Sequence, residues 1–304
     1  MYGDYRRTSV VKPFDPWKSS LCTCRPKYSL HPYTGCSHFC LYCYATAYIG
    51  RKPSMPKQRF LDRLKRDLKF INKELFIEMS SSSDPYPPIE SWMGLTRKTL
   101  EILSSEKYRV IIVTKSDIIV RDADLLLKTP SVVMITITTL DEDLAKKLEP
   151  GAPPPWKRLN AIEKLSEYGI PVGIRIDPVI PGLNDDPNSI SEIIREASLR
   201  GAKHVVTSTY KARPDNLKRM ISAFPDKADY WRKLYLELGE KIHGYYYLPR
   251  QLRIKILKPV IDAALRYGLT ASVCREGLGL EFMRAPSCDG QHMIKYHPLY
   301  SSLT

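Results

Sequence analysis

Residues 36–43 read Cys36-Ser37-His38-Phe39-Cys40-Leu41-Tyr42-Cys43, so three cysteines are spaced C-x3-C-x2-C in a single short segment. Thiolates at this density are good ligands for iron–sulfur clusters. A cubane cluster has four irons, so three cysteines leave one iron open to a substrate or cofactor. A structural zinc site usually closes all four positions with protein ligands, often from two separate knuckles. The alternatives to an iron–sulfur cluster are a zinc-binding loop and three buried free thiols.

The longer segment from Tyr33 to Ala45, with the aromatic Tyr42 before the last cysteine, resembles the signature loop of the radical S-adenosylmethionine (SAM) superfamily. Within it, the segment is similar to the branch related to spore photoproduct lyase, often labelled DNA-repair-photolyase-like. The resemblance implies a [4Fe–4S] cluster on Cys36, Cys40 and Cys43, with the amino and carboxylate groups of SAM on the fourth iron. It also implies an electron donor such as a ferredoxin or flavodoxin. One electron would then cleave SAM to methionine and a 5′-deoxyadenosyl radical, which abstracts a hydrogen atom.

Short apolar runs alternate with amphipathic segments along the chain. We expect strands at 28–34, 75–79, 110–114, 132–138, 172–176 and 204–207, and helices at 95–103, 118–127, 141–148, 156–168 and 190–199. This alternation favours a parallel sheet, and six units are too few for the eight of a full barrel. The resemblance implies an open barrel, which agrees with this count. We therefore predict an α/β fold: a partial (β/α)6 TIM-type barrel at 28–210, an N-terminal extension at 1–27, and a mostly helical, partly irregular C-terminal region at 211–304.

Composition indicates a globular protein with an anionic partner. The 304 residues are 43% hydrophobic, and 47 Lys+Arg against 33 Asp+Glu give a net charge of +14. That balance favours a polyanionic partner, with nucleic acid as the first candidate. The charges are scattered rather than blocked, so a basic but well-mixed surface is the alternative.

Three features predict a cytoplasmic protein with no membrane partner. The N-terminal charges are not followed by an apolar segment, so we expect no secretory signal. The most apolar runs, 110–113 and 132–137, are too short to span a membrane. Seven cysteines, three of them in the metal-like motif, favour a reducing compartment over a disulfide framework.

Polar residues just after the strands are the candidate site, because parallel barrels carry their active sites at the carboxyl ends of the strands. The serine run at 80–83 with Asp84 follows the second strand. In the superfamily this position usually meets the amino group of SAM. The chain departs from the common Gly-Gly-Glu form, and its Ser-Asp-Pro-Tyr resembles the lyase-like branch. We expect Ser81, Ser82 and Asp84 to contact SAM, with an ordinary helix-capping turn as the alternative.

Arg175 and Asp177 lie in the fifth apolar strand, where charged side chains are costly unless they are paired or functional. Alternate strand positions share a face, so both should point inward. The resemblance places this segment against the adenine and ribose of SAM, and Tyr42 near the adenine. An ion pair inside the barrel, and simple loop packing for Tyr42, are the alternatives.

Two further groups follow strands three and four. Residues 114–116, Thr-Lys-Ser, could meet a carboxylate or phosphate, or could cap the next helix. Glu149 and Arg158 resemble a family segment, and the arginine could hold the SAM carboxylate bidentately. We favour a surface ion pair on a helix for these two residues.

Four cysteines lie outside the motif: Cys22, Cys24, Cys274 and Cys288. If the chain termini meet at the barrel mouth, these residues could bind a second iron–sulfur cluster or a zinc ion, with His292 as a replacement ligand. A thiol that returns a hydrogen atom to a substrate radical, as in spore photoproduct lyase, and unligated thiols are the alternatives.

Basic residues at 51–69 and 211–219, with Tyr48 and Tyr210 among them, could hold a phosphate backbone and stack on bases. Solvated helix faces are the alternative. The leading prediction is a radical SAM enzyme, lyase-like or transferase-like, that acts on DNA or RNA in lesion repair or RNA modification. One rival is a radical SAM enzyme acting on a protein or metabolite. The other is a metal-stabilised nucleic-acid-binding protein without turnover.

Overall fold

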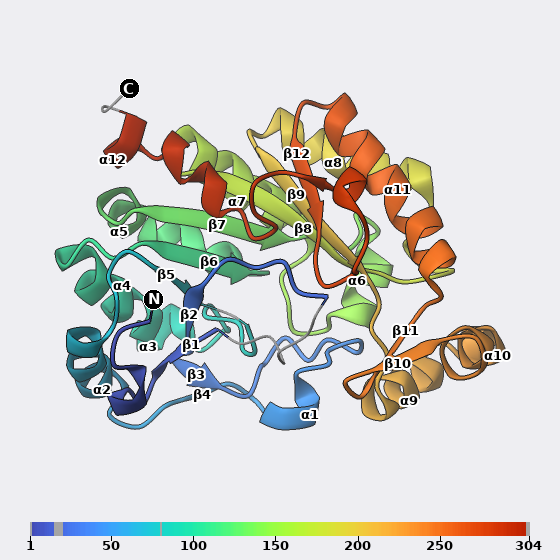
Figure 1. Ribbon diagram of the computed structural model, residues 1–304, viewed down its shortest axis with the longest axis horizontal. Coiled ribbons are helices and arrows are strands. Elements are labelled where there is room, and N and C mark those ends of the chain that lie inside the picture. Colours follow the sequence, from blue (N-terminus) through green and yellow to red (C-terminus); the bar gives the residue numbers. More distant parts are fainter. Residues whose placement is uncertain (1, 15–20, 80, 302–304) are drawn as a thin grey trace.

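A computed structural model describes residues 2–14, 21–79 and 81–301 of the chain. A curved sheet of nine strands forms the centre of the described part, and helices cover its outer face (Figure 1). The strand order is β1-β2-β5-β6-β7-β8-β9-β12-β13. The seven parallel strands are β2 (Lys27–Leu30), β5 (Phe76–Met79), β6 (Val110–Thr114), β7 (Ser131–Thr136), β8 (Val172–Val179), β9 (His204–Thr209) and β12 (Thr270–Val273).

Both edges of the sheet end in a short antiparallel strand. At one edge β1 (Val11–Pro13) pairs with β2, and at the other β13 (Met283–Arg284) pairs with β12. Two small hairpins stand apart from this sheet: β3 (Tyr33–Thr34) with β4 (Met55–Pro56), and β10 (Glu240–Ile242) with β11 (Tyr245–Tyr247). The sheet is therefore an open, partial barrel whose two edges are formed by residues near the two ends of the chain.

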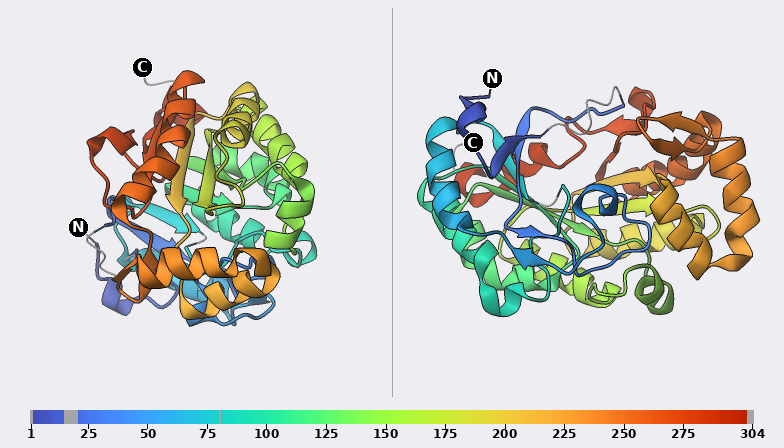
Figure 2. Two further views of the ribbon diagram at one scale, coloured as in Figure 1. Left: turned by 90° about the vertical axis from the view of Figure 1, so that its right-hand side faces the viewer. Right: turned by 90° about the horizontal axis from the view of Figure 1, so that it is seen from below.

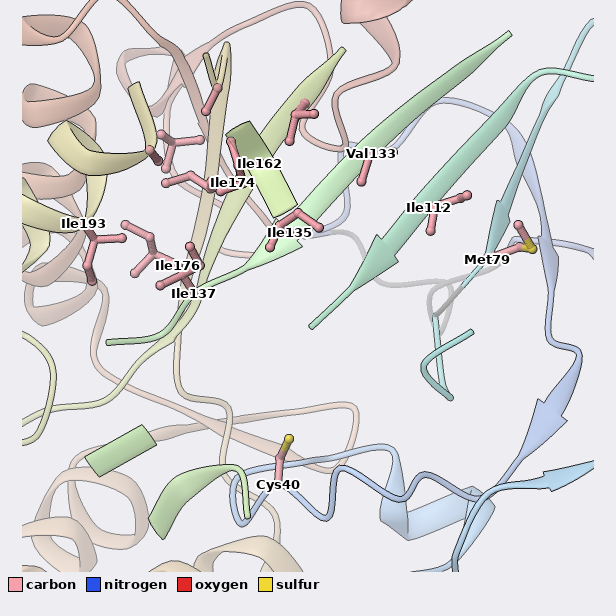
Figure 3. Close-up of a cluster of buried hydrophobic side chains, with 14 of the residues drawn as sticks. Cys40, Met79, Ile112, Val133, Ile135, Ile137, Ile162, Ile174, Ile176 and Ile193 are labelled. Atoms are coloured by element: carbon pink, nitrogen blue, oxygen red, sulfur yellow. The ribbon is translucent and has the colours of Figure 1, made fainter. Parts of the chain in front are cut away.

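The central strands are buried on both faces, and most of their residues are apolar or small and polar. Every residue of β5, β7 and β9 is buried, which is typical of parallel strands covered on both sides. Figure 3 shows part of this core, with Ile112, Ile135, Ile174 and Ile176 on neighbouring strands. Five of the six expected strands are present with ends that differ by a few residues. The first, expected at 28–34, is divided between β2 in the main sheet and β3 in a separate two-stranded sheet.

The helices, in chain order, are α1 (Thr46–Ile49), α2 (Phe60–Asp67), α3 (Glu90–Met93), α4 (Leu95–Ser105), α5 (Ala123–Lys128), α6 (Glu142–Leu148), α7 (Pro155–Glu167), α8 (Pro187–Leu199), α9 (Pro214–Ala223), α10 (Ala228–Arg232), α11 (Arg250–Arg266) and α12 (Pro298–Ser301). Short 3-10 turns lie at Tyr5–Arg7, Leu68–Phe70, Asp117–Asp122, Pro225–Lys227, Leu280–Phe282 and Gln291–Tyr296, and a π-helical turn continues α10 at Lys233–Glu237. Among the described residues, no helix is both long and apolar enough to cross a bilayer.

Local sequence explains where the long helices begin. Asp141 and Asp186 cap α6 and α8, their carboxylates accepting hydrogen bonds from Leu144 N at 3.0 Å and Ser189 N at 2.8 Å. Proline occupies the first position of α7, α8 and α9, where its missing N–H has no cost. The four expected core positions of α8, from Ile190 to Ala197, are buried.

Three strands of the sheet were not expected: β1 lies in the N-terminal extension, and β12 and β13 lie in the C-terminal region. Residues 270–273 were predicted to lie where the helical region gives way to an irregular one, but they form β12 and pair in parallel with β9. The sheet therefore extends beyond residue 210 into the C-terminal region. Both views in Figure 2 place the N-terminal segment and the C-terminal loop on the same side of the sheet. The Lys27 ammonium on β2 lies 2.5 Å from the Asp289 carboxylate, so the two ends of the chain meet there.

Candidate functional site

A cavity of about 360 Å³ lies at the carboxyl ends of the parallel strands. Thirteen of the side chains that the sequence singles out line it, whereas Ser116, Glu149, Arg158 and His292 do not. They are Cys22, Cys24, Cys36, Cys40, Tyr42, Cys43, Ser81, Ser82, Asp84, Arg175, Asp177, Cys274 and Cys288. Ser80, the first residue of the serine run, lies outside the described residues. The fold thus brings the candidates together, while their binding roles stay predictions.

The cysteine loop lies in close contact with the segment between α6 and α7. A Cβ atom on Gly151 would lie 1.9 Å from the Ser37 carbonyl oxygen, so a side chain there would force the two segments apart. The Gly151 N–H donates to the His38 carbonyl at 3.0 Å. At the start of the loop, Gly35 has φ +71°, and a Cβ would lie 2.2 Å from the Pro53 carbonyl oxygen. Two glycines therefore permit the loop to fold against the barrel.

Side chains from elsewhere bind the carbonyl groups of this loop. The Arg219 guanidinium donates to the carbonyls of Leu41 at 3.1 Å and Cys43 at 2.9 Å. The Asn216 amide donates to the Tyr42 carbonyl at 3.0 Å, and Arg51 donates to that of Phe39 at 3.0 Å. Buried carbonyls need such donors, so these contacts fix the backbone that carries the three thiols.

The three loop thiols form a donor set that an iron–sulfur cluster can use. Burial raises the pKa of Cys36 to about 11 and raises that of Cys40 further, so metal binding would release protons. Figure 3 shows the Cys40 side chain directed from the loop toward the sheet. In the described part of the chain, no three His, Cys, Asp or Glu side chains are grouped to hold a metal ion. Cubane ligands bind different irons and need not converge on one point, so the donor set fits a cluster.

The Asp84 carboxylate connects the loop with the ends of β5 and β6. It lies 3.3 Å from His38 Nδ1 and accepts hydrogen bonds from Thr114 Oγ1 at 2.7 Å, Lys115 N at 2.9 Å and Tyr86 N at 2.9 Å. Burial opposes ionisation, but His38 and these hydrogen bonds outweigh it and lower the pKa of Asp84 to about 2. Asp84 is thus ionised, and both of its oxygens already have protein partners.

The Tyr42 hydroxyl is hydrogen-bonded to a buried ion pair. Its hydroxyl donates to Glu149, which also accepts from Thr138 Oγ1 at 3.0 Å. Arg158 Nη1 lies 2.5 Å from Glu149, and both side chains are at most 1% exposed. Burial opposes ionisation of Glu149, but Arg158 and Lys115 outweigh it and lower its pKa below the usual range. The expectation of a surface pair was wrong, because the loop after α6 turns Glu149 under the cysteine loop.

Arg175 and Asp177 form an ion pair that faces the cavity, on one face of β8 as expected. The second Asp177 oxygen accepts a hydrogen bond from Ser208 Oγ at 2.5 Å. Burial would raise the pKa of Asp177, yet Arg175 and Lys211 lower it below its usual value. The ion pair that was the alternative is present, and it lies at the cavity where the contact with SAM was predicted.

Two members of the expected basic rim do not face solvent. Tyr210 is 1% exposed and its hydroxyl donates to Asn216 Oδ1 at 2.7 Å, so its ring cannot stack on a base. Lys211 is buried 2.9 Å from the Glu276 carboxylate. Both residues line the cavity at the strand ends, so they lie at the barrel mouth but are buried there, and a role in binding nucleic acid stays a prediction.

Sequence reasoning missed a second buried charge group. Lys27 forms ion pairs with Glu78 and with Asp289, and all three line the cavity. Glu78 lies within the apolar strand β5, which is the same signal that identified Asp177. Ser116 caps the turn after β6, accepting from Ile118 N at 3.3 Å, as one alternative predicted.

Comparison with known proteins agrees with this architecture. A protein of Methanocaldococcus jannaschii, named only as uncharacterized, is 36% identical over 194 residues, which cover 61% of this chain and 71% of that protein. A radical SAM Nalpha-GlyT isomerase of Pseudomonas phage M6 is 22% identical over 86% of this chain and 59% of its own length. A spore photoproduct lyase variant with bound AdoMet and dinucleoside spore photoproduct superimposes with a TM-score of 0.65. That match has 19% identity and covers 86% of this chain and 79% of the lyase chain.

The lyase comparison concerns the fold, because its sequence identity is low. The family model of the Radical SAM superfamily matches residues 30–194, which is more than half of the chain and includes the cysteine loop and strands β5 to β8. This chain therefore belongs to the Radical SAM superfamily and is an enzyme of that superfamily.

Proposed function

We propose that the protein binds a [4Fe–4S] cluster through Cys36, Cys40 and Cys43, cleaves SAM reductively, and acts on a nucleic-acid substrate. The observation that carries the proposal is the shared cavity, in which these thiols and the expected SAM contacts face one another. When bound, the cluster would supply the electron that converts SAM to methionine and a 5′-deoxyadenosyl radical. An external reductant such as a ferredoxin or flavodoxin would provide that electron.

The residues of the chain would hold and orient SAM. Ser81 and Ser82 offer hydroxyl groups at the carboxyl end of β5, and Ser81 Oγ lies 2.9 Å from His31 Nε2. Arg175 and Asp177 offer a cation and an anion on the opposite side of the barrel, where the adenosine part would lie. Asp84 acts as a positioning residue, because its oxygens are engaged with the loop and with β6.

An aromatic and cationic group at the cavity supports a nucleic-acid substrate. Tyr44, Tyr48 and Arg275 line the cavity, and the Tyr48 side chain is 44% exposed. The Arg275 guanidinium lies over the Tyr44 ring at 5.5 Å from its centroid. Aromatic rings beside arginine can stack on bases, and the net charge of +14 favours a polyanion. The dinucleoside bound to the structurally similar lyase is consistent with this class.

The proposal is tested by anaerobic reconstitution with iron and sulfide, followed by an assay for 5′-deoxyadenosine with dithionite as reductant. We expect SAM cleavage by the wild type and none by Cys40→Ala, which should also lose the visible absorption of the cluster while keeping most of the fold. Leu41→Met is the matched control in the same loop, and it should retain both properties. Full activity of Cys40→Ala would refute the ligand assignment.

Substrate class needs a separate measurement. Binding to tRNA and to duplex DNA should weaken steeply as salt increases, with a linear dependence of log K on log salt. Salt-insensitive or absent binding, together with SAM cleavage, would favour a protein or metabolite substrate. Nucleic-acid binding without SAM cleavage under strong reductant would indicate a metal-stabilised binding protein.

A further inference from the structure

The four cysteines outside the loop meet at one place. Cys24 and Cys288 are separated by 264 positions in the sequence, yet their sulfur atoms lie 3.5 Å apart. The Cys24 backbone N–H donates to Cys22 Sγ at 3.5 Å. Cys24 and Cys274 pack against the small apolar cluster that includes Cys288. All four thiols line the cavity, so every cysteine of the chain faces the same space.

These cysteines come from opposite edges of the open barrel. Cys22 and Cys24 precede β2, which lies toward one edge of the sheet. Cys274 directly follows β12, and Cys288 lies in the loop after β13, at the other edge. The pair of Lys27 with Asp289 spans the same gap. The thiols therefore gather where the sheet itself does not close.

The donor set consists of thiols alone. All seven cysteines are free, so no disulfide already links the two edges. His292 does not line the cavity, and its ring nitrogens are hydrogen-bonded to Thr270 Oγ1 at 3.1 Å and Ser287 Oγ at 2.9 Å. Four thiolates are the ligand set of zinc and of iron–sulfur clusters.

We propose that Cys22, Cys24, Cys274 and Cys288 hold a second thiolate-bound metal centre that bridges the open side of the barrel. It is separate from the three-cysteine loop and does not depend on the proposed SAM cleavage. Lys27 and Arg175 act electrostatically on Cys24 and Cys274 and would offset the negative charge of bound thiolates. Within the described residues the four thiols do not converge on the position of a single ion. Side-chain rotation would therefore accompany metal binding, as ligand sites commonly adjust on metallation.

A disulfide between Cys24 and Cys288 is the competing explanation for their proximity. It would use two thiols and leave Cys22 and Cys274 beside it without a role. A metal centre uses all four, and it explains why the N-terminal segment and the C-terminal loop both deliver cysteines to the cavity. The two explanations differ in metal content, in the oxidation state of the thiols and in the number of cysteines involved.

The test measures iron, sulfide and zinc per chain in anaerobically prepared full-length protein. One variant replaces the loop cysteines (Cys36→Ala, Cys40→Ala and Cys43→Ala), and another replaces the second group (Cys24→Ser and Cys288→Ser). We expect the loop variant to lose roughly four irons and to retain the remaining metal. The second variant should lose only the remaining metal, and Met293→Leu, a buried sulfur in the same apolar cluster, should lose none.

Mössbauer and X-ray absorption spectra identify the retained metal, and either iron with sulfide or about one zinc in an all-sulfur shell supports the proposal. Equal metal content in the wild type and the second variant overturns it, as does a Cys24–Cys288 disulfide in mass spectra of unreduced protein. If the second variant fails to fold, the loop variant alone decides, because a loop variant that binds no metal contradicts the proposal.

The two proposals can fail separately. The metal content of the loop variant tests the second centre without SAM cleavage, whereas SAM cleavage by the wild type tests the proposed function.

Discussion

The buried pair of Glu149 and Arg158 gives a quantitative prediction for Glu149→Gln. The two side chains are 0% and 1% exposed and 2.5 Å apart, so the substitution leaves a buried guanidinium without its counter-ion. Removing one partner of a buried pair costs about 3–5 kcal/mol. The entropy of unfolding is about 0.6 kcal/mol/K for a chain of 304 residues. The apoprotein should therefore melt about 5–8 °C lower, as measured by circular dichroism under reducing conditions. Iron retention should fall too, because the Tyr42 hydroxyl exchanges an ionised acceptor for a neutral amide and loses a charge-assisted hydrogen bond.

Two controls distinguish the cost of a buried unpaired charge from the cost of losing any ion pair. Arg158→Met combined with Glu149→Gln removes both charges, and the double variant should be more stable than Glu149→Gln alone. Asp262→Asn disrupts the exposed pair of Lys258 and Asp262 on α11, and it should cost less than about 1 kcal/mol. If Glu149→Gln melts no lower than Asp262→Asn, the reasoning from burial fails.

Three further substitutions test other parts of the site. Gly151→Ala places a Cβ against the Ser37 carbonyl and should lower iron content per chain, measured after reconstitution. Burial lowers the pKa of His31 to about 3, so only the unfolded chain gains a proton below pH 6.5. The free energy of unfolding should therefore fall by about 2 kcal/mol between pH 6.5 and 4.5, and urea titrations should show that His31→Gln lacks this loss. Asp177→Asn removes an acceptor and the partner of Arg175, and should weaken SAM binding roughly tenfold or more by calorimetry.

Each of these has a control or a contrary result. Gly268→Ala adds a Cβ with no atom within 4 Å, so it should strain the backbone yet leave iron content unchanged. Equal pH dependence in the wild type and His31→Gln would contradict the assignment of the buried neutral imidazole. Asp262→Asn is also the control for SAM binding. If the Asp177→Asn and Asp262→Asn variants bind SAM with equal affinity, Asp177 is not part of the cofactor site.

Sequence patterns predicted most of the sheet because its strands are buried on both faces and its helices carry caps. The strand β12 escaped because Thr270-Ala271-Ser272-Val273 has little apolar character, and its burial depends on β9 beside it. Arg175 and Asp177 could be found because charges inside an apolar strand stand out. Glu149 gave no such signal, since its burial follows from the path of a loop. The burial of Tyr210 and Lys211 could not be predicted for the same reason, because a basic and aromatic sequence alone does not tell whether side chains at a strand end are exposed or line a cavity.

The contact between Gly151 and the cysteine loop has a consequence for the lifetime of the enzyme. The glycine contact and the carbonyl partners Arg51, Asn216 and Arg219 hold the loop through the polypeptide itself. If the loop carries the proposed cluster, damage to the metal would leave these contacts in place. Restoration of the enzyme would then depend on iron supply rather than on refolding.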